Sequence, residues 1–383
     1  MLHKKLVSIF FLSILFLCCK EEKKALPIQD IEPQQIEMKY ASGFTITEFQ
    51  DYKILNITNP WPKSDKQFKY ALVPKENQSK ITLNKDDYDG IITIPIETIV
   101  VTSTTHIPAL EHLGVENRLI GFPGCDYVSS EKTRARINTG QVRELGSNEG
   151  INTEILLELR PDLVMSFGVE GSNKSLETIN ASGISVIYNG DWVEKSPLAK
   201  AEWIKCFGIL FDKSEKANMV FNTIETNYMD AKKMASEAIE KPSVLCGAMY
   251  KDIWYLPNGT SPEAQILKDA NTNYLWSDTE ASGSLALSFE TVFEKAQDAE
   301  LWISPSYYGS YDDLKASNDH YTKFKAFQSK NIYTFSNTKG ETGGVLYYEL
   351  GVLRPDLVLK DMIKVCHPNL LPEYKTTFFK PLK

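Results

Sequence analysis

The chain has 383 residues, of which 42% are hydrophobic and 24% are charged. This length predicts about two to three domains of ordinary size, and the apolar content argues against a disordered chain. The formal net charge of −8 argues against nucleic acid as a partner, because proteins that bind it gain affinity by neutralising phosphates with Lys and Arg.

The first residues have the pattern of a secretion signal. A basic start at His3–Lys5 precedes an apolar run at Leu6–Leu17, which is shorter than the roughly 20 residues that a membrane-spanning helix needs. Cys18 and Cys19 follow, and an apolar core that ends at a cysteine resembles the lipobox of bacterial lipoproteins. We predict a signal peptide at 1–18 and a lipid anchor on Cys19 that holds the protein in the bacterial cell envelope. Acylation of Cys18 and ordinary secretion are the alternatives.

Residues 19–39 are predicted to be a flexible tether. Its charged start at Lys20–Lys24 resembles a surface-export signal of some lipoproteins, and it is equally typical of any solvated linker. Residues 40–95 are predicted to be a β-rich extension, because apolar residues alternate between Tyr40 and Phe49 and a breaker follows at Asn59–Pro62.

Two α/β lobes follow the extension. Short apolar runs separated by helical stretches begin at Ile99, and repeated units of this kind predict a parallel sheet that is covered on both faces. We place a first lobe at 96–211 and a second at 242–383, where the alternation restarts. Between them, residues 212–241 carry apolar side chains every three or four positions, which predicts one long helix joining the lobes. The expected fold class is therefore α/β, with two lobes of mostly parallel central sheets.

Chemistry of catalysis is missing from the sequence. There is no G-x-S-x-G nucleophile elbow, phosphate-binding loop, H-E-x-x-H or G-x-G-x-x-G motif, and the five histidines are dispersed. We therefore expect no enzymatic activity, no metal site and no cofactor.

Ligand recognition fits the sequence better. Open α/β sheets bind ligands at the loops that follow the carboxyl ends of their parallel strands. In this chain those loops are rich in aromatic, hydroxyl and amide side chains, a mixture that suits a bulky and partly apolar ligand. Three arginines follow the Tyr127 loop, and they are either bidentate partners for carboxylate or catecholate oxygens of the ligand or solvated loop charges. They are Arg134, Arg136 and Arg143. The candidate ligand-binding residues are His106, Tyr127, Arg143, Phe167, Trp192, Tyr250, Trp254, Tyr307 and Tyr308.

An acidic pattern, Glu-x-x-x-Glu-x-x-x-Asp, occurs once in each lobe, starting at Glu154 and at Glu290. Each copy opens a predicted helix that leads to a strand. Acidic residues are favoured in the first turn of any helix by its dipole, so this pattern alone assigns no function.

Several stretches together resemble the class III substrate-binding proteins of ABC transporters, the group that binds cobalamin, ferric siderophores and haem. The resemblance lies in their order and spacing around the long helix. The stretches are Ile99–Gly114, Arg118–Gly121, Gly146–Gly168, Leu287–Glu300 and Lys330–Thr334. The resemblance implies a monomer that clamps a small ligand between its lobes and delivers the ligand to a permease.

The resemblance also implies roles for individual residues. In this family one surface glutamate per lobe docks onto arginines of the permease dimer, and the matching positions are Glu154 and Glu290. Of the aromatic positions that hold cobalamin, only Phe167 is matched. The expected ligand is therefore an iron complex, a siderophore or haem, or a related corrinoid of the cobalamin type. His106 is a candidate haem ligand. The alternative function is a surface lipoprotein that captures its ligand without docking to a permease.

Overall fold

The computed structural model describes residues 32–169, 171, 173–281 and 283–383. The predicted signal peptide, Cys19 and most of the predicted tether lie outside these residues. From Pro33 to Lys383 the chain forms one unit. Within the described ranges, no helix combines the length and the apolar character that a membrane crossing requires.

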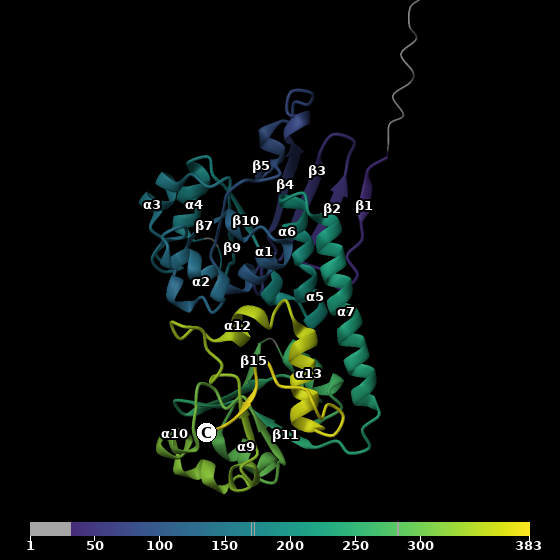
Figure 1. Ribbon diagram of the computed structural model, residues 1–383, viewed down its shortest axis with the longest axis vertical. Coiled ribbons are helices and arrows are strands. Elements are labelled where there is room, and N and C mark those ends of the chain that lie inside the picture. Colours follow the sequence, from purple (N-terminus) through teal and green to yellow (C-terminus); the bar gives the residue numbers. More distant parts are fainter. Residues whose placement is uncertain (1–31, 170, 172, 282) are drawn as a thin grey trace, which may run out of the picture. The chain divides into compact units, whose positions relative to one another are not determined.

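A five-stranded sheet occupies the segment predicted to be a β-rich extension (Figure 1). Its order is β1-β2-β3-β4-β5, and all neighbours are antiparallel except β4 and β5. The prediction that the tether continues to residue 39 is wrong, because β1 already pairs with β2. The strands are β1 (Gln34–Ile36), β2 (Phe44–Glu48), β3 (Lys53–Thr58), β4 (Gln67–Pro74) and β5 (Gly90–Ile94).

The first lobe is built on a parallel sheet in the order β10-β9-β6-β7-β8. The extension joins it at the β10 edge, where the buried Tyr70 hydroxyl donates to the carbonyl of Val186 at 2.8 Å. The strands are β6 (Ile99–Val101), β7 (Leu119–Phe122), β8 (Arg143–Glu144), β9 (Leu163–Ser166) and β10 (Ser185–Tyr188). The helices are α1 (Ile107–Leu113), α2 (Glu131–Asn138), α3 (Thr153–Leu159), α4 (Lys174–Ala181), α5 (Pro197–Glu202) and α6 (Ile204–Leu210).

The second lobe has a sheet in the order β14-β11-β16-β17-β18, parallel except for its last pair, and a small antiparallel sheet, β12-β13-β15. The strands are β11 (Ser243–Cys246), β12 (Ala248–Tyr250), β13 (Ile253–Pro257), β14 (Asn273–Tyr274), β15 (Ser284–Leu287), β16 (Leu301–Ile303), β17 (Ile332–Thr334) and β18 (Lys380–Pro381). The helices are α8 (Pro262–Asp269), α9 (Phe289–Ala296), α10 (Tyr311–Ser317), α11 (Lys325–Gln328), α12 (Leu346–Leu350) and α13 (Pro355–Cys366).

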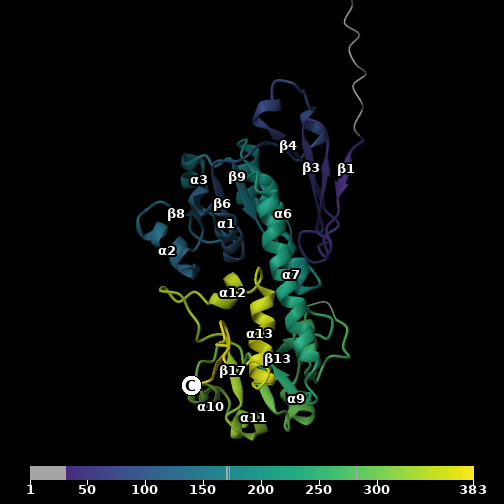
Figure 2. The ribbon, with the colours of Figure 1, turned by 45° about the vertical axis from the view of Figure 1, so that its right-hand side comes forward.

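Helix α7 (Ser214–Ser236) runs alongside both lobes (Figures 1 and 2). It packs against α6 of the first lobe and α13 of the second. Its buried residues recur every three or four positions, which is why one helix serves both lobes. They are Ala217, Phe221, Ile224, Tyr228, Ala231 and Ala235. The helix lies within the predicted range of 212–241, and the α/β fold class with mostly parallel sheets is confirmed.

A second contact joins the lobes through α12, which packs against α1 and the 3-10 turn at Thr104–His106. The buried Glu349 carboxylate accepts the backbone N–H groups of Ser129 and Ser130 at 2.6 and 2.9 Å. Nearby, the Arg134 guanidinium donates to the Thr342 hydroxyl at 2.9 Å. These bonds hold the two lobes together beside α12, whose Tyr347 and Tyr348 line a large cavity.

Candidate functional site

A cavity of about 1410 Å³ lies between the two lobes. In the second lobe it opens at the carboxyl ends of β11, β16 and β17, where Gly247, Ser304 and Phe335 line it. The chain continues from β11 to β14 on one side of it and then to β16 on the other side. This change of direction is a topological switch point, and open α/β sheets bind ligands at such points. The first lobe contributes the loop that follows β10, including Trp192 and Val193.

Gly247 is required by the geometry of this cavity edge. Its φ of +73° is a conformation that side chains disfavour, and a Cβ atom there would lie 1.9 Å from the carbonyl oxygen of Tyr255. Ser304 adopts a φ of +54° at the end of the neighbouring strand. This conformation costs free energy at Ser304 but not at Gly247, because glycine has no Cβ atom.

Aromatic side chains form much of the cavity wall in the second lobe. Phe335 and Tyr347 stack with ring centroids 4.4 Å apart, and Tyr348 packs against Phe335 at 5.2 Å. Burial, followed by its interaction with Tyr307, raises the pKa of the Tyr348 phenol, which therefore stays protonated at neutral pH. From the first lobe, Trp192 also lines the cavity, and its buried indole N–H has no hydrogen-bond partner among the described residues.

Charged side chains divide between the two sides of the cavity. Lys63, Lys195 and Lys200 come from the extension and the first lobe, whereas Glu263 and Glu280 come from the second. No ion pair engages these three lysines within the part of the chain that the structure describes. The lysines that line the cavity therefore come from the side of the extension and the first lobe, which also contributes Glu194 to the lining.

Of the predicted ligand-binding residues, Trp192 lines this cavity. Tyr307 lies at its margin, with its ring 6.3 Å from that of Tyr348. Tyr127 is 72% exposed and lines a separate, smaller cavity with residues of the 342–344 loop. The structure places the following outside the lining of both cavities: Arg143, exposed in β8; Phe167, partly buried after β9; Tyr250, exposed in β12; and Tyr308, packed on Tyr321.

Two of the predicted ligand residues are in the core, and these predictions are corrected. His106 has no exposed surface, packs its ring against Phe207, and has its pKa lowered to about 3 by burial, so it is a neutral core residue. Trp254 is also fully buried, and its indole N–H donates to the carbonyl of Cys246 at 2.9 Å. Strand alternation explains the second case, because Trp254 and its neighbour Tyr255 point to opposite faces of β13 and Tyr255 lines the cavity.

Glu154 and Glu290 are both exposed in the first turns of α3 and α9. The N-caps of these helices are supplied by Asn152 and Ser288, whose side chains accept backbone N–H groups. The glutamates are therefore not needed for capping and are available at the surface of each lobe.

The extension contributes residues that sequence reasoning did not assign to a site. Pro62 and Lys63, in the turn between β3 and β4, line the cavity. Glu194 of the first lobe is a further lining residue that was not predicted. Residues 59–62 signal a turn, but no local pattern places that turn beside a cavity formed by the second lobe more than 180 residues later.

The family model for periplasmic binding proteins matches residues 99–338. An uncharacterized lipoprotein of Methanocaldococcus jannaschii is 25% identical over 363 residues, which cover 89% of this chain and 84% of that protein. A second uncharacterized protein of the same organism is 23% identical over 314 residues, covering 80% of this chain and 92% of that one.

Solved structures share the fold. A periplasmic haem-binding protein from Pseudomonas aeruginosa matches with a TM-score of 0.56 and 16% identity, covering 75% of this chain and 98% of that one. A protein from Staphylococcus epidermidis described as a possible iron-binding (periplasmic solute-binding) protein matches with a TM-score of 0.56 and 17% identity, covering 71% of this chain and 99% of that one. Identities this low establish similarity of fold alone.

Proposed function

Since the chain belongs to the class III periplasmic binding proteins, which are solute-binding proteins of ABC transporters and not enzymes, we propose that it captures an iron complex and delivers it to a permease. The complex is a ferric siderophore or haem, held in the cavity between the lobes.

The cavity is the observation that carries this proposal. Its volume of about 1410 Å³ exceeds the roughly 300–1,000 Å³ of pockets for ordinary small molecules, which suits a bulky cargo. Its position at strand ends of both lobes lets each lobe supply part of the contact surface. The names of two proteins of similar fold, a possible iron-binding protein and a haem-binding protein, support an iron complex as that cargo.

The chemistry of the wall suits a metal complex with an organic shell. Phe335, Tyr347 and Tyr348 provide flat apolar surface for rings. Trp192 adds an indole ring from the first lobe, and the lysines attract ligand oxygens. The iron in such a complex is cargo, bound by its own chelator, so no protein metal ligand is required for this mode of binding.

Delivery would use one exposed glutamate on each lobe. We assign Glu154 and Glu290 to docking on a permease dimer, because both are exposed in the first turn of a helix and neither side chain caps that helix. Each exposed ion pair contributes about 0–1 kcal/mol, so the pairs set orientation more than affinity.

We further propose that Cys19 is acylated and anchors the protein in the bacterial cell envelope. The name of the lipoprotein relative in Methanocaldococcus jannaschii supports this assignment. A short apolar run that ends at the cysteine pair supports it as well.

Tryptophan fluorescence tests the binding step. The purified protein is titrated with haemin, ferrioxamine B, a ferric tris-catecholate and cyanocobalamin. We expect saturable quenching at one-to-one stoichiometry by one of the iron complexes. Most of the quenching amplitude should disappear in Trp192→Phe, which removes the indole in the cavity wall, and remain in Trp254→Phe, which alters the buried indole outside it. Absence of saturable binding by all four probes would contradict the proposal.

A further inference from the structure

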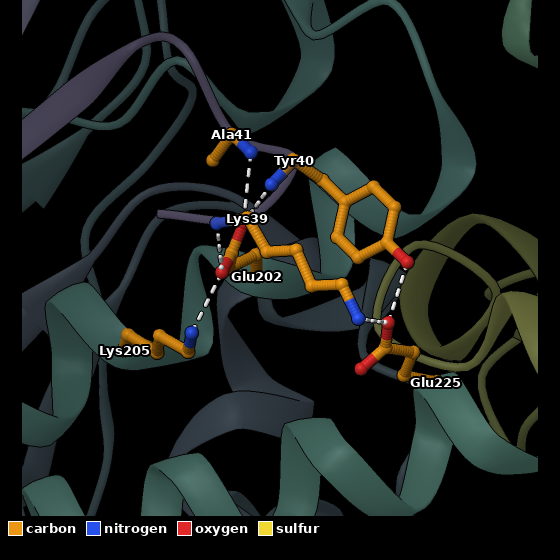
Figure 3. A network of polar contacts seen from close by, with 6 residues as sticks. All are labelled: Lys39, Tyr40, Ala41, Glu202, Lys205 and Glu225. Atoms are coloured by element: carbon orange, nitrogen blue, oxygen red, sulfur yellow. Dashed lines mark hydrogen bonds and ion pairs between the residues drawn. The ribbon is translucent and has the colours of Figure 1, made fainter. Parts of the chain in front are cut away.

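Residues 39–43, between β1 and β2, form a segment that we call the N-terminal strap. Its backbone is held by the buried Glu202 at the end of α5 (Figure 3). One carboxylate oxygen accepts the Lys39 N–H at 2.9 Å and the Lys205 ammonium at 2.6 Å. The other accepts the N–H groups of Tyr40 and Ala41 at 2.7 and 2.8 Å. Four donors satisfy this buried carboxylate, and three of them are backbone groups of the strap.

A second buried carboxylate, that of Glu194, holds the other end of the strap. One of its oxygens accepts the backbone N–H groups of Ser42 and Gly43 at 2.9 and 2.8 Å and the Trp203 indole N–H at 3.0 Å. The other accepts the Ser42 hydroxyl at 3.1 Å. A Cβ at Gly43 would lie 2.8 Å from the Trp203 ring, so a larger residue at this position would force the strap or the ring to shift.

Glu194 and Glu202 bracket one wall of the cavity. Trp192, Lys195 and Lys200 all lie in the segment 192–202 and all line the cavity. Glu194 borders the cavity too, but its oxygens are occupied by the strap and by Trp203. The conformation of this wall is therefore tied at two points to a segment more than 150 residues earlier in the chain.

The strap has a third attachment that does not involve the wall. The Tyr40 hydroxyl donates to Glu225 of α7 at 2.5 Å, and the Lys39 ammonium pairs with the same carboxylate (Figure 3). Glu225 is absent from the cavity lining. This arrangement provides a matched control, because one carboxylate holds the strap at the wall and another holds it elsewhere.

We propose that the N-terminal extension is a working part of the ligand site, in which the strap positions the cavity wall at 192–202 through Glu194 and Glu202. Glu194 is a positioning residue: it orders Trp192, Lys195 and Lys200 for the ligand while its own oxygens face the strap. The proposal rests on the function proposed above, and it adds a role for the extension, which also lines the cavity with Lys63 in its β3–β4 turn.

Hydrogen exchange of the ligand-free chain tests the positioning, in Glu194→Gln and in the control Glu225→Gln. Replacing an anion that accepts four hydrogen bonds should speed amide exchange in residues 190–203 by about tenfold or more, whereas the control should loosen only the strap. Ser42→Ala is the milder variant, since it removes one donor to Glu194 and keeps the backbone bonds; it should change exchange in the same segment to a smaller extent.

Ligand affinity is then measured with the probe that the wild type binds, which is haemin, ferrioxamine B or the ferric tris-catecholate. We expect Glu194→Gln to weaken it about tenfold and Glu225→Gln to change it less than about twofold. Equal exchange in the wall of both variants would overturn the proposal, and so would a loosened wall with unchanged affinity. If the wild type binds none of the probes, the proposed function fails, and the exchange comparison alone decides whether the strap positions the wall.

Discussion

Glu349 provides a quantitative test of the contact between the lobes. Its carboxyl group is 2% exposed, on α12 of the second lobe, and bonds to Ser129 and Ser130 of the first. Burial, above all, and the neighbouring Glu111 on α1 raise its pKa from 4.5 to about 7, against the lowering effects of the two N–H donors and of Arg134 on α2. The group is thus partly protonated at neutral pH while it holds the two lobes together.

The raised pKa fixes the sign of a pH effect on stability. The folded protein binds this proton more tightly than the unfolded chain, so the contribution to stability is complete below pH 4.5 and is lost as the pH rises through about 7. The difference between these pKa values, at 1.36 kcal/mol per pH unit, gives a loss of about 3 kcal/mol in the free energy of unfolding.

Urea unfolding at pH 5 and pH 8 measures this loss. We expect Glu349→Gln, which stays neutral at both values, to remove between about 2 and 3 kcal/mol of the difference in unfolding free energy between them, because part of the loss has already occurred at pH 5. Glu341→Gln, an exposed position in the same segment, should leave the wild-type difference intact. Parallel pH profiles for the wild type and Glu349→Gln would refute the reasoning.

Three other predictions concern docking, ligand charge and the strap. The double variant Glu154→Gln, Glu290→Gln should lower uptake through the permease about tenfold while the purified protein keeps its ligand affinity; normal uptake would reject the docking assignment. Lys63→Glu should weaken binding of an anionic ferric tris-catecholate about threefold at low salt and less at high salt, compared with the control Lys66→Glu at an exposed position outside the cavity. Equal effects of the two variants would show that Lys63 does not belong to the site. Burial acts to raise the pKa of Glu202, but hydrogen bonds from Lys205 and the strap lower it overall. The stabilisation that Glu202 gives is therefore present above the ordinary carboxyl pKa and is lost as the pH falls through the lowered value. Amide exchange in the strap should then quicken in acid relative to the intrinsic rate, and exchange that does not quicken would contradict this.

Features that depend on local periodicity were predictable from the sequence. The buried strands around Ile99 and Leu163 are short apolar runs because both faces of a parallel sheet are covered. Helix α7 was predictable for a similar reason, since burying one face against α6 and α13 imposes a three-to-four-residue spacing from Ala217 to Ala235.

The composition of the site was predictable only in part, because it depends on contacts between distant segments. The loop after β10 was expected to carry ligand residues, and Trp192 does line the cavity. His106 follows a strand end as well, yet packing against Phe207 turns its ring into the core. The bonds from the strap to Glu194 join residues that are more than 150 positions apart, and neither partner carries a local signal of the other.

A crystal structure of the protein with its retained iron complex tests the central claim most directly. The account predicts density for the complex between the lobes, in contact with Trp192 of the first and Tyr348 of the second. A complex bound instead at the smaller cavity beside Tyr127, or on the outer surface of one lobe, would contradict it.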